Sequence, residues 1–183
     1  MRIPRNVAAS AIAAAVAIGG SVTLAAPAQA AATTHCKTSS KNFDLPGKPD
    51  VKVSLNICIK YTGSSGGYRH YKAWVNKASW EGNSFYIGGK RFNDFSILMR
   101  AEHGSTKVEN CNYGICEERS VSGEINDSNS GSKTFATGAS GYGEAYVKTK
   151  SKNWTADATA YVDIADDGKG SKAWGLTGTS AVS

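Results

Sequence analysis

The sequence lacks a recognisable catalytic or metal-binding constellation. Its three histidines, His35, His70 and His103, stand apart from one another, so no His-x-x-x-His pair or similar metal-ligand spacing is present. A nucleophile elbow is missing as well, because Tyr142 follows residues 138–141 at the position where that motif requires glycine. These absences leave no motif that fixes an activity, and they favour a non-enzymatic protein without a metal or cofactor.

Two short patterns come closest to a chemical site. Glu102 and His103 would supply an acid and a base to a small secreted hydrolase, although a polar strand end entering a turn is the simpler explanation. Residues 163–168 resemble the start of a calcium loop, but Ala165 and Trp174 occupy positions where that loop needs oxygen ligands. We therefore expect a hairpin turn there, and the hydrolase remains an alternative.

A strong charge of one sign is also missing. The chain has 21 Lys and Arg residues against 15 Asp and Glu residues, a formal net charge of +6. Its lysines are dispersed, and Lys148, Lys150 and Lys152 alternate as on the solvated face of a strand rather than lining a groove. Nucleic acid is therefore not an expected partner.

Helical patterns are absent after residue 30. No window there has apolar residues at the helical spacing, whereas short alternating segments separated by turn residues recur. This predicts an all-β protein, a single-domain antiparallel β-sandwich over residues 51–183, with a flattened β-barrel as the alternative. Residues 31–50 contain Pro46, Gly47 and Pro49, which predict an irregular N-terminal arm.

Residues 1–30 have the pattern of a cleaved signal peptide. Two arginines precede an alanine-rich apolar segment, and Ala28 and Ala30 are the small residues that a signal peptidase reads. Glycines interrupt the apolar segment and no basic stop-transfer sequence follows it, so we expect cleavage rather than a membrane-spanning anchor. The remaining chain would then be secreted to the extracellular side.

All four cysteines lie beyond the expected cleavage site. They are Cys36, Cys58, Cys111 and Cys116. An even number of cysteines in an exported chain indicates two disulfides, with three pairings to choose from. Proximity in the sequence favours Cys36 with Cys58 and Cys111 with Cys116, whereas a zinc site would need two close pairs.

Residues 51–60 form the clearest strand pattern in the chain. Five apolar side chains alternate with polar ones or cysteine, namely Val51, Val53, Leu55, Ile57 and Ile59. Alternation places Cys58 on the face opposite these five residues. A bridge from Cys58 to Cys36 must therefore lie on the far side of the sheet, where we expect the N-terminal arm to cover it.

The strand expected over residues 70–80 has two competing inner faces. One face has Tyr71, Ala73 and Val75, and the other has Trp74, Ala78 and Trp80. A β-bulge near Asn76 would let each set face the core over part of the strand.

The last hairpin predicts a specific register. Small alanines alternate along residues 154–164, a turn follows at Asp166–Gly170, and the chain returns with two large residues. Antiparallel pairing through this turn predicts Trp174 opposite Val162 and Leu176 opposite Ala160.

Aromatic side chains are the feature best suited to binding. Four of them cluster around one predicted strand, namely Tyr68, Tyr71, Trp74 and Trp80. Such rings stack on sugars and also anchor protein interfaces, but β-sandwich cores use aromatic residues too. Ligand contact and core packing therefore both remain open for each of the four.

These features together resemble small secreted actinobacterial two-disulfide β proteins of uncharacterised role. The residues that carry the resemblance are Cys36, Cys58, Trp80, Asp167, Gly168, Lys169, Gly170 and Trp174. It covers most of the chain after the signal peptide and includes no diagnostic functional motif. Some small secreted actinobacterial β proteins are adaptor subunits of exported toxin particles and others are protease inhibitors.

The sequence thus leads to one principal expectation and two alternatives. The first is a secreted, non-enzymatic β-sandwich that contacts another secreted or cell-surface protein, as an adaptor, an inhibitor or an envelope-associated component. A module that binds cell-wall polysaccharide through Trp74 or Trp80 is the second. The small hydrolase described above is the third.

Overall fold

The computed structural model describes residues 33–82, 89–112, 115–135 and 142–183, and strands dominate this part of the chain. In order, the elements are β1 (Thr34–Leu45), β2 (Lys48–Ser65), β3 (Tyr68–Gly82), β4 (Phe92–His103), β5 (Thr106–Glu109), β6 (Cys111–Asn112), β7 (Ile115–Cys116), β8 (Arg119–Ser120), α1 (Ser122–Asp127), β9 (Ser130–Thr134), β10 (Glu144–Thr149), β11 (Thr155–Ile164) and β12 (Lys172–Gly175). The predicted all-β fold is confirmed. Within these ranges, no helix has the length and apolar character needed to cross a membrane.

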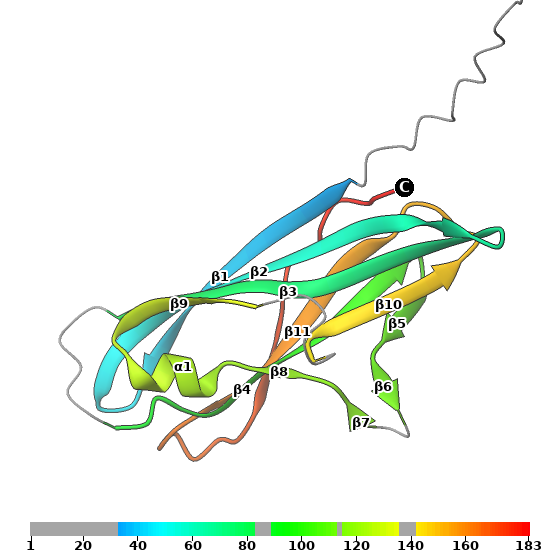
Figure 1. Cartoon of the computed structure of the whole chain (residues 1–183). Helices are drawn as coiled ribbons and strands as arrows, with labels where there is room; N and C mark the ends of the chain where they lie inside the picture. Colours follow the sequence, from blue (N-terminus) through cyan, green and yellow to red (C-terminus); the bar gives the residue numbers. More distant parts are fainter. Residues whose placement is uncertain (1–32, 83–88, 113–114, 136–141) are drawn as a thin grey trace, which may run out of the picture. The chain divides into compact units, whose positions relative to one another are not determined.

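Two five-stranded antiparallel sheets form the body of the domain, and β6 and β7 pair as a separate two-stranded sheet (Figure 1). Sheet A has the order β1-β2-β3-β10, and β9 pairs with the part of β3 that β10 leaves free. Sheet B has the order β12-β11-β4-β5, and β8 adds to β4. Among the described strands none pairs from one sheet to the other, so the fold is the predicted sandwich and not the flattened barrel.

The core lies between the two sheets because their inner faces alternate apolar residues with outward polar ones. The buried inner residues include Val51, Val53, Leu55, Ile57 and Ile59 on β2, Phe95, Ile97, Met99 and Ala101 on β4, and Ala156, Ala158 and Ala160 on β11. Each fully buried Ile or Leu side chain contributes about 1.5–3 kcal/mol to stability. The strand pattern of residues 51–60 is therefore confirmed as a core face.

The predicted irregular arm over residues 31–50 is wrong, because most of it is the strand β1. β1 pairs with β2 without interruption from Thr34 to Phe43, and β2 already begins at Lys48. Pro46 and Gly47 only form the turn between the two strands, where Gly47 adopts a φ of 64°. β1 escaped detection because an edge strand needs few apolar residues, and only Phe43 and Leu45 of β1 are buried hydrophobics.

The bulge predicted near Asn76 is confirmed. Asn56 pairs with Lys77 and Ile57 pairs with Val75, so Asn76 is the extra residue on β3. Before the bulge the odd-numbered residues of β3 face the core, and after it the even-numbered ones do. Tyr71, Ala73 and Val75 are therefore buried together with Ala78 and Trp80.

The predicted register of the last hairpin is wrong by two residues. Trp174 lies opposite Ala160, and the Leu176 N–H donates to the Ala158 carbonyl at 2.9 Å. This pairing puts the centre of the turn at Asp167, one residue earlier than expected, and an Asp167 carboxylate oxygen accepts a hydrogen bond from the Lys169 N–H at 2.8 Å. As a result, Trp174 lies opposite an alanine, Ala160, rather than opposite the larger Val162.

A buried arginine fastens the segment around α1 to the start of β4. The Arg91 side chain is fully buried, and its guanidinium donates to the carbonyls of Ile125 and Ser128 at 3.0 and 2.7 Å. It also donates to the amide oxygen of Asn129 at 2.7 Å. The Asn126 side chain adds hydrogen bonds to the backbone of Phe92. Together these contacts close one end of the core.

Candidate functional site

The four aromatic residues singled out from the sequence have different environments. Tyr71 and Trp80 are buried in the core, and the Trp80 indole N–H also donates to Ser128. Both rings are therefore almost completely covered by the protein. Trp74 is half-buried on the outer face of sheet A, whereas Tyr68 is exposed. Of the four, Trp74 and Tyr68 therefore present the most surface to a partner.

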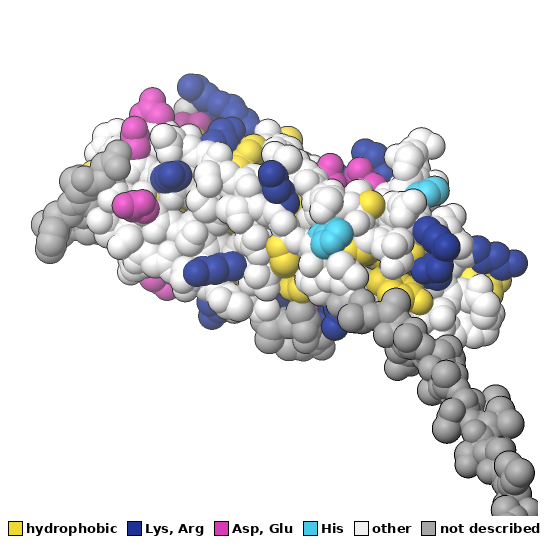
Figure 2. All heavy atoms as spheres, turned by 90° about the horizontal axis from the view of Figure 1, so that it is seen from above, with side chains coloured by type: hydrophobic (Ala, Val, Ile, Leu, Met, Phe, Trp, Pro, Cys, Tyr) yellow, Lys and Arg dark blue, Asp and Glu magenta, His cyan; other side chains and the backbone are white. Residues whose placement is uncertain are grey.

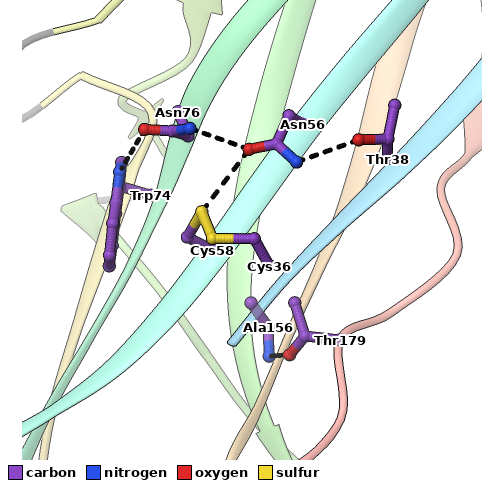
Figure 3. The surroundings of a disulfide bond; sticks show 8 residues. All are labelled: Cys36, Thr38, Asn56, Cys58, Trp74, Asn76, Ala156 and Thr179. Atoms are coloured by element: carbon purple, nitrogen blue, oxygen red, sulfur yellow. Dashed lines mark hydrogen bonds between the residues drawn. A yellow bond between two sulfur atoms is a disulfide. The ribbon is translucent and has the colours of Figure 1, made fainter. Parts of the chain in front are cut away.

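The disulfide between Cys36 and Cys58 is confirmed, and it joins directly opposite residues of β1 and β2 (Figure 3). It lies on the outer face of sheet A, as alternation predicts. Cys58 is nevertheless buried, and Trp74 is its neighbour on β3. The expectation that an arm covers this face is wrong, because the residues before Asp50 extend the sheet at its edge instead of crossing it.

A row of side-chain hydrogen bonds runs beside the disulfide (Figure 3). Asn76 donates to the Asn56 amide oxygen at 2.8 Å, and Asn56 donates to the Thr38 hydroxyl at 2.9 Å. The Trp74 indole N–H donates to Asn76 at 3.4 Å. The row links β1, β2 and β3 and holds the rings and amides of this face in fixed positions.

For the second predicted disulfide, between Cys111 and Cys116, the structure describes the backbone pairing. The β6–β7 pairing places Cys111 opposite Cys116, as a bridge between them requires. The side chain of Cys116 lies outside the described residues, so this bond stays a prediction.

A cleft of about 360 Å³ lies between the edge strands of the two sheets. β1 ends sheet A and β12 ends sheet B on the same side of the sandwich. The cleft is lined by Lys41, Asn42, Phe43, Asp44, Pro46, Val162, Ile164, Asp167, Lys169, Lys172 and Trp174. Its volume lies within the range of pockets that hold small molecules or single side chains.

Two aromatic rings and a lysine dominate the cleft. Phe43 and Trp174 meet edge-on with ring centroids 5.8 Å apart. The Lys41 ammonium lies 5.3 Å from the Phe43 centroid and 6.0 Å from that of Trp174. A cation near two ring faces fixes the rings by a cation–π attraction of about 0.5–1 kcal/mol at an exposed site.

Polar contacts close the cleft at both ends. At one end Lys48 pairs with Asp166 at 2.8 Å and joins the β1–β2 turn to the β11–β12 turn. The hydrogen bond and the charge of Lys48 lower the pKa of the Asp166 carboxyl. At the other end the Thr177 N–H donates to the Ser39 hydroxyl at 2.8 Å. These contacts tie the edges of the two sheets together on either side of the cleft.

A second surface lies on the outer face of sheet A, where two exposed tyrosines stand among lysines. The ammonium groups of Lys148 and Lys150 lie 5.1 and 5.7 Å from the Tyr68 ring, and that of Lys72 lies 5.1 Å from the Tyr146 ring. In Figure 2, dark blue and yellow side chains lie together at the right-hand end, where the β2–β3 turn lies in Figure 1. We call these five residues the tyrosine–lysine surface.

A buried carboxylate supports this surface from below. Glu144 accepts a hydrogen bond from the Tyr146 hydroxyl and pairs with Lys72 at 2.9 Å. Burial lowers the pKa of Lys72, but hydrogen bonds to Tyr146 and Glu144 and the charge of Glu144 outweigh it and raise that pKa overall. Lys72 therefore stays charged and holds Tyr146 in place.

The candidate acid–base pair is engaged in structural contacts. Glu102 forms ion pairs with Arg100 and Lys107, and the His103 ring stacks on Trp154 at 5.6 Å. In the described ranges no three His, Cys, Asp or Glu side chains are grouped as a metal site would require. The hydrolase alternative gains no support from this arrangement.

Comparison of the chain with family models, with curated proteins and with solved structures finds no match. The cleft itself was not foreseen from the sequence, because Phe43 and Trp174 come from strands at opposite ends of the chain. The signal available in the sequence was the predicted hairpin, in which Trp174 and Leu176 come back along the alanine-rich strand β11.

Proposed function

We propose that this protein is a secreted, non-enzymatic β-sandwich that acts through contacts with another secreted or cell-surface protein, as an adaptor, an inhibitor or an envelope-associated component. The observation that carries the proposal is the cleft between β1 and β12, with Phe43, Trp174 and Lys41 at its centre. A concave site with aromatic anchors is typical of the central residues of protein interfaces.

The chemistry of the cleft suits a side chain of a protein partner. An apolar group of the partner would rest on Phe43 and Trp174, and its polar neighbours would meet the lysines of the rim. Those lysines are Lys41, Lys169 and Lys172, with Asp44 and Asp167 beside them. Long lysine side chains adapt to a partner while their stems cover the apolar rings.

The proposal is tested by capture from culture supernatant with immobilised protein. Wild type is compared with Trp174→Ala and with the matched control Trp74→Ala, which removes a half-buried indole from the outer face of sheet A. A partner identified by mass spectrometry should be retained by wild type and by the control and lost with Trp174→Ala. Equal retention by all three proteins, or no retained protein at all, would contradict the proposal.

A second candidate function, binding of an acidic polysaccharide, is favoured by the tyrosine–lysine surface. Tyr68 and Tyr146 present exposed rings for stacking on sugars, and Lys148 and Lys150 supply charge for acidic groups. Retention on an immobilised polyuronic acid should fall with Tyr146→Ala and persist with Tyr142→Ala, an exposed tyrosine outside this surface. Retention that ignores Tyr146→Ala would remove this candidate.

A further inference from the structure

The free edge of β1 has a hydrogen-bonding pattern that follows from the disulfide. Cys36 and Cys58 face each other with their Cα atoms 4.0 Å apart, the shorter of the two spacings that alternate in an antiparallel pair. Residues at such positions do not bond to the facing strand. By alternation along β1, the N–H and C=O groups of Thr38, Ser40 and Asn42 point away from β2.

No described strand pairs with this outer edge of β1. An unpaired edge of this length is a template for another extended chain, which would complete the hydrogen bonds of these three residues. The disulfide holds β1 in register on β2 and therefore keeps the template rigid.

The side chains between these positions decide which chain can bind. Lys37, Ser39, Lys41 and Phe43 lie opposite the core residues Ile57, Leu55, Val53 and Val51, so they project toward the core side of sheet A. Lysines on the inner side of an edge strand oppose pairing with an apolar strand. They also oppose pairing of β1 with β1 of a second copy, because like charges would be brought close together.

We propose that β1 binds an extended acidic segment of the protein partner as an added strand of sheet A. The proposal rests on the proposed function and names the chemistry of the partner. Carboxylates of the segment would face Lys41 and, four residues further along, Lys37. An apolar side chain two residues before the first carboxylate would face Phe43 and enter the cleft beside Trp174.

Charge complementarity selects this occupant over the others. Lys169 and Lys172 lie on the cleft rim with Lys41, and these three lysines outnumber the rim carboxylates of Asp44 and Asp167. A strand carrying two carboxylates would attract the lysines, whereas a second copy of this chain would bring its own lysines against them. A polysaccharide could use the charges but could not complete the backbone hydrogen bonds of Thr38, Ser40 and Asn42.

The test uses synthetic peptides and the full folded domain. The probe is acetyl-Thr-Phe-Thr-Glu-Thr-Thr-Thr-Glu-Thr-amide, together with its reversed sequence, so that both strand directions are covered. Matched peptides carry Gln or Lys in place of both Glu residues. The double variant Lys37→Glu, Lys41→Glu changes exposed side chains of β1 only.

We expect a Glu peptide to bind wild type about tenfold more tightly than its Gln counterpart, and the Lys peptide not to bind at about 1 mM. The double variant should reverse this preference. Binding should slow amide exchange at Thr38, Ser40 and Asn42 by at least about tenfold, while Lys41, already bonded to β2, changes little.

Three results would overturn the proposal: no binding of either Glu peptide at about 1 mM, a preference that the double variant leaves unchanged, or binding without amide protection on β1. Protection of β1 that grows with protein concentration in the absence of peptide would instead assign the edge to a second copy. Failure here, combined with capture of a partner through Trp174, leaves the proposed function standing. If neither the peptide-binding assay nor the capture experiment succeeds, both the strand-addition proposal and the proposed function are refuted.

Discussion

The ring of Phe43 on β1 meets the indole of Trp174 on β12 edge-on, at a centroid distance of 5.8 Å and an interplanar angle of 73°. The contact joins the two edge strands that bound the cleft. Trp174 is half-buried, and its backbone lies opposite Ala160, which leaves space for the indole. The cleft therefore depends on one large ring and on the small residue beside it.

Trp174→Ala should lower the free energy of unfolding by about 1–2 kcal/mol, because it removes an aromatic pair and part of the apolar contact with Phe43. Urea unfolding followed by circular dichroism measures the change. The same experiment on Trp74→Ala provides the control, since that indole contacts the outer face of sheet A. A loss above about 4 kcal/mol would mean that Trp174 is a core residue rather than a cleft residue.

Replacement of Arg91 by Met should lower the free energy of unfolding by about 3 kcal/mol, because buried oxygens of Ile125, Ser128 and Asn129 lose their donors. Arg69→Met is the matched control. Arg69 is only half-buried and lies over the Tyr61 ring at 5.4 Å, so its loss should cost less than about 1 kcal/mol. Equal effects in urea unfolding would contradict the role assigned to Arg91.

Replacement of Cys36 and Cys58 by Ala should lower the free energy of unfolding by about 3 kcal/mol, the loop-entropy value for a bridge that spans 22 residues. Amide exchange should accelerate first on β1, which then loses its covalent tie to β2. Peptide mapping under non-reducing conditions checks the pairing directly, and it also tests the predicted bridge between Cys111 and Cys116. A Cys36–Cys111 peptide would refute both.

Asp166→Asn should remove one source of acid sensitivity. The pKa of Asp166 is lowered in the folded state by Lys48, so the ion pair stabilises the fold fully above the unfolded pKa and progressively less as pH falls through the folded one. Wild type should therefore lose more stability than the variant between about pH 4 and 2. Asn suits the test because it tolerates the φ of 65° found at this position. Parallel stability curves for the two proteins would show that the pair contributes nothing.

Features with a local signature could be predicted from the sequence. Strict alternation identified the core face of β2 and the side of the sheet on which Cys58 lies. The competition between two faces on β3 located the bulge at Asn76. These predictions succeeded because a side chain's face depends only on its neighbours along the strand.

Features that depend on contacts between distant segments could not be predicted. The strand β1 could not be predicted because backbone pairing with β2 holds it in place, while its mostly polar sequence lacks the alternating apolar residues that indicate a strand. Arg91 gave no signal, since the identified acceptors of its guanidinium are three backbone carbonyls and the side-chain amide oxygen of Asn129. The cleft arises only when the sheets stack and bring Phe43 to Trp174.

The extra residue at Asn76 reverses which residues of β3, odd-numbered or even-numbered, face the core. Trp74 and Trp80 are separated by an even number of positions, yet one faces outward and the other lies in the core. Below the bulge β3 pairs with β10, and above it with β9, so the shift coincides with a change of neighbour. Removing Asn76 would leave a regular strand in which Val75, Ala78 and Trp80 still face the core, whereas regular alternation through all the residues present would turn Ala78 and Trp80 to solvent. The bulge therefore lets two apolar patterns of opposite phase share one strand, Tyr71, Ala73 and Val75 before Asn76 and Ala78 and Trp80 after it.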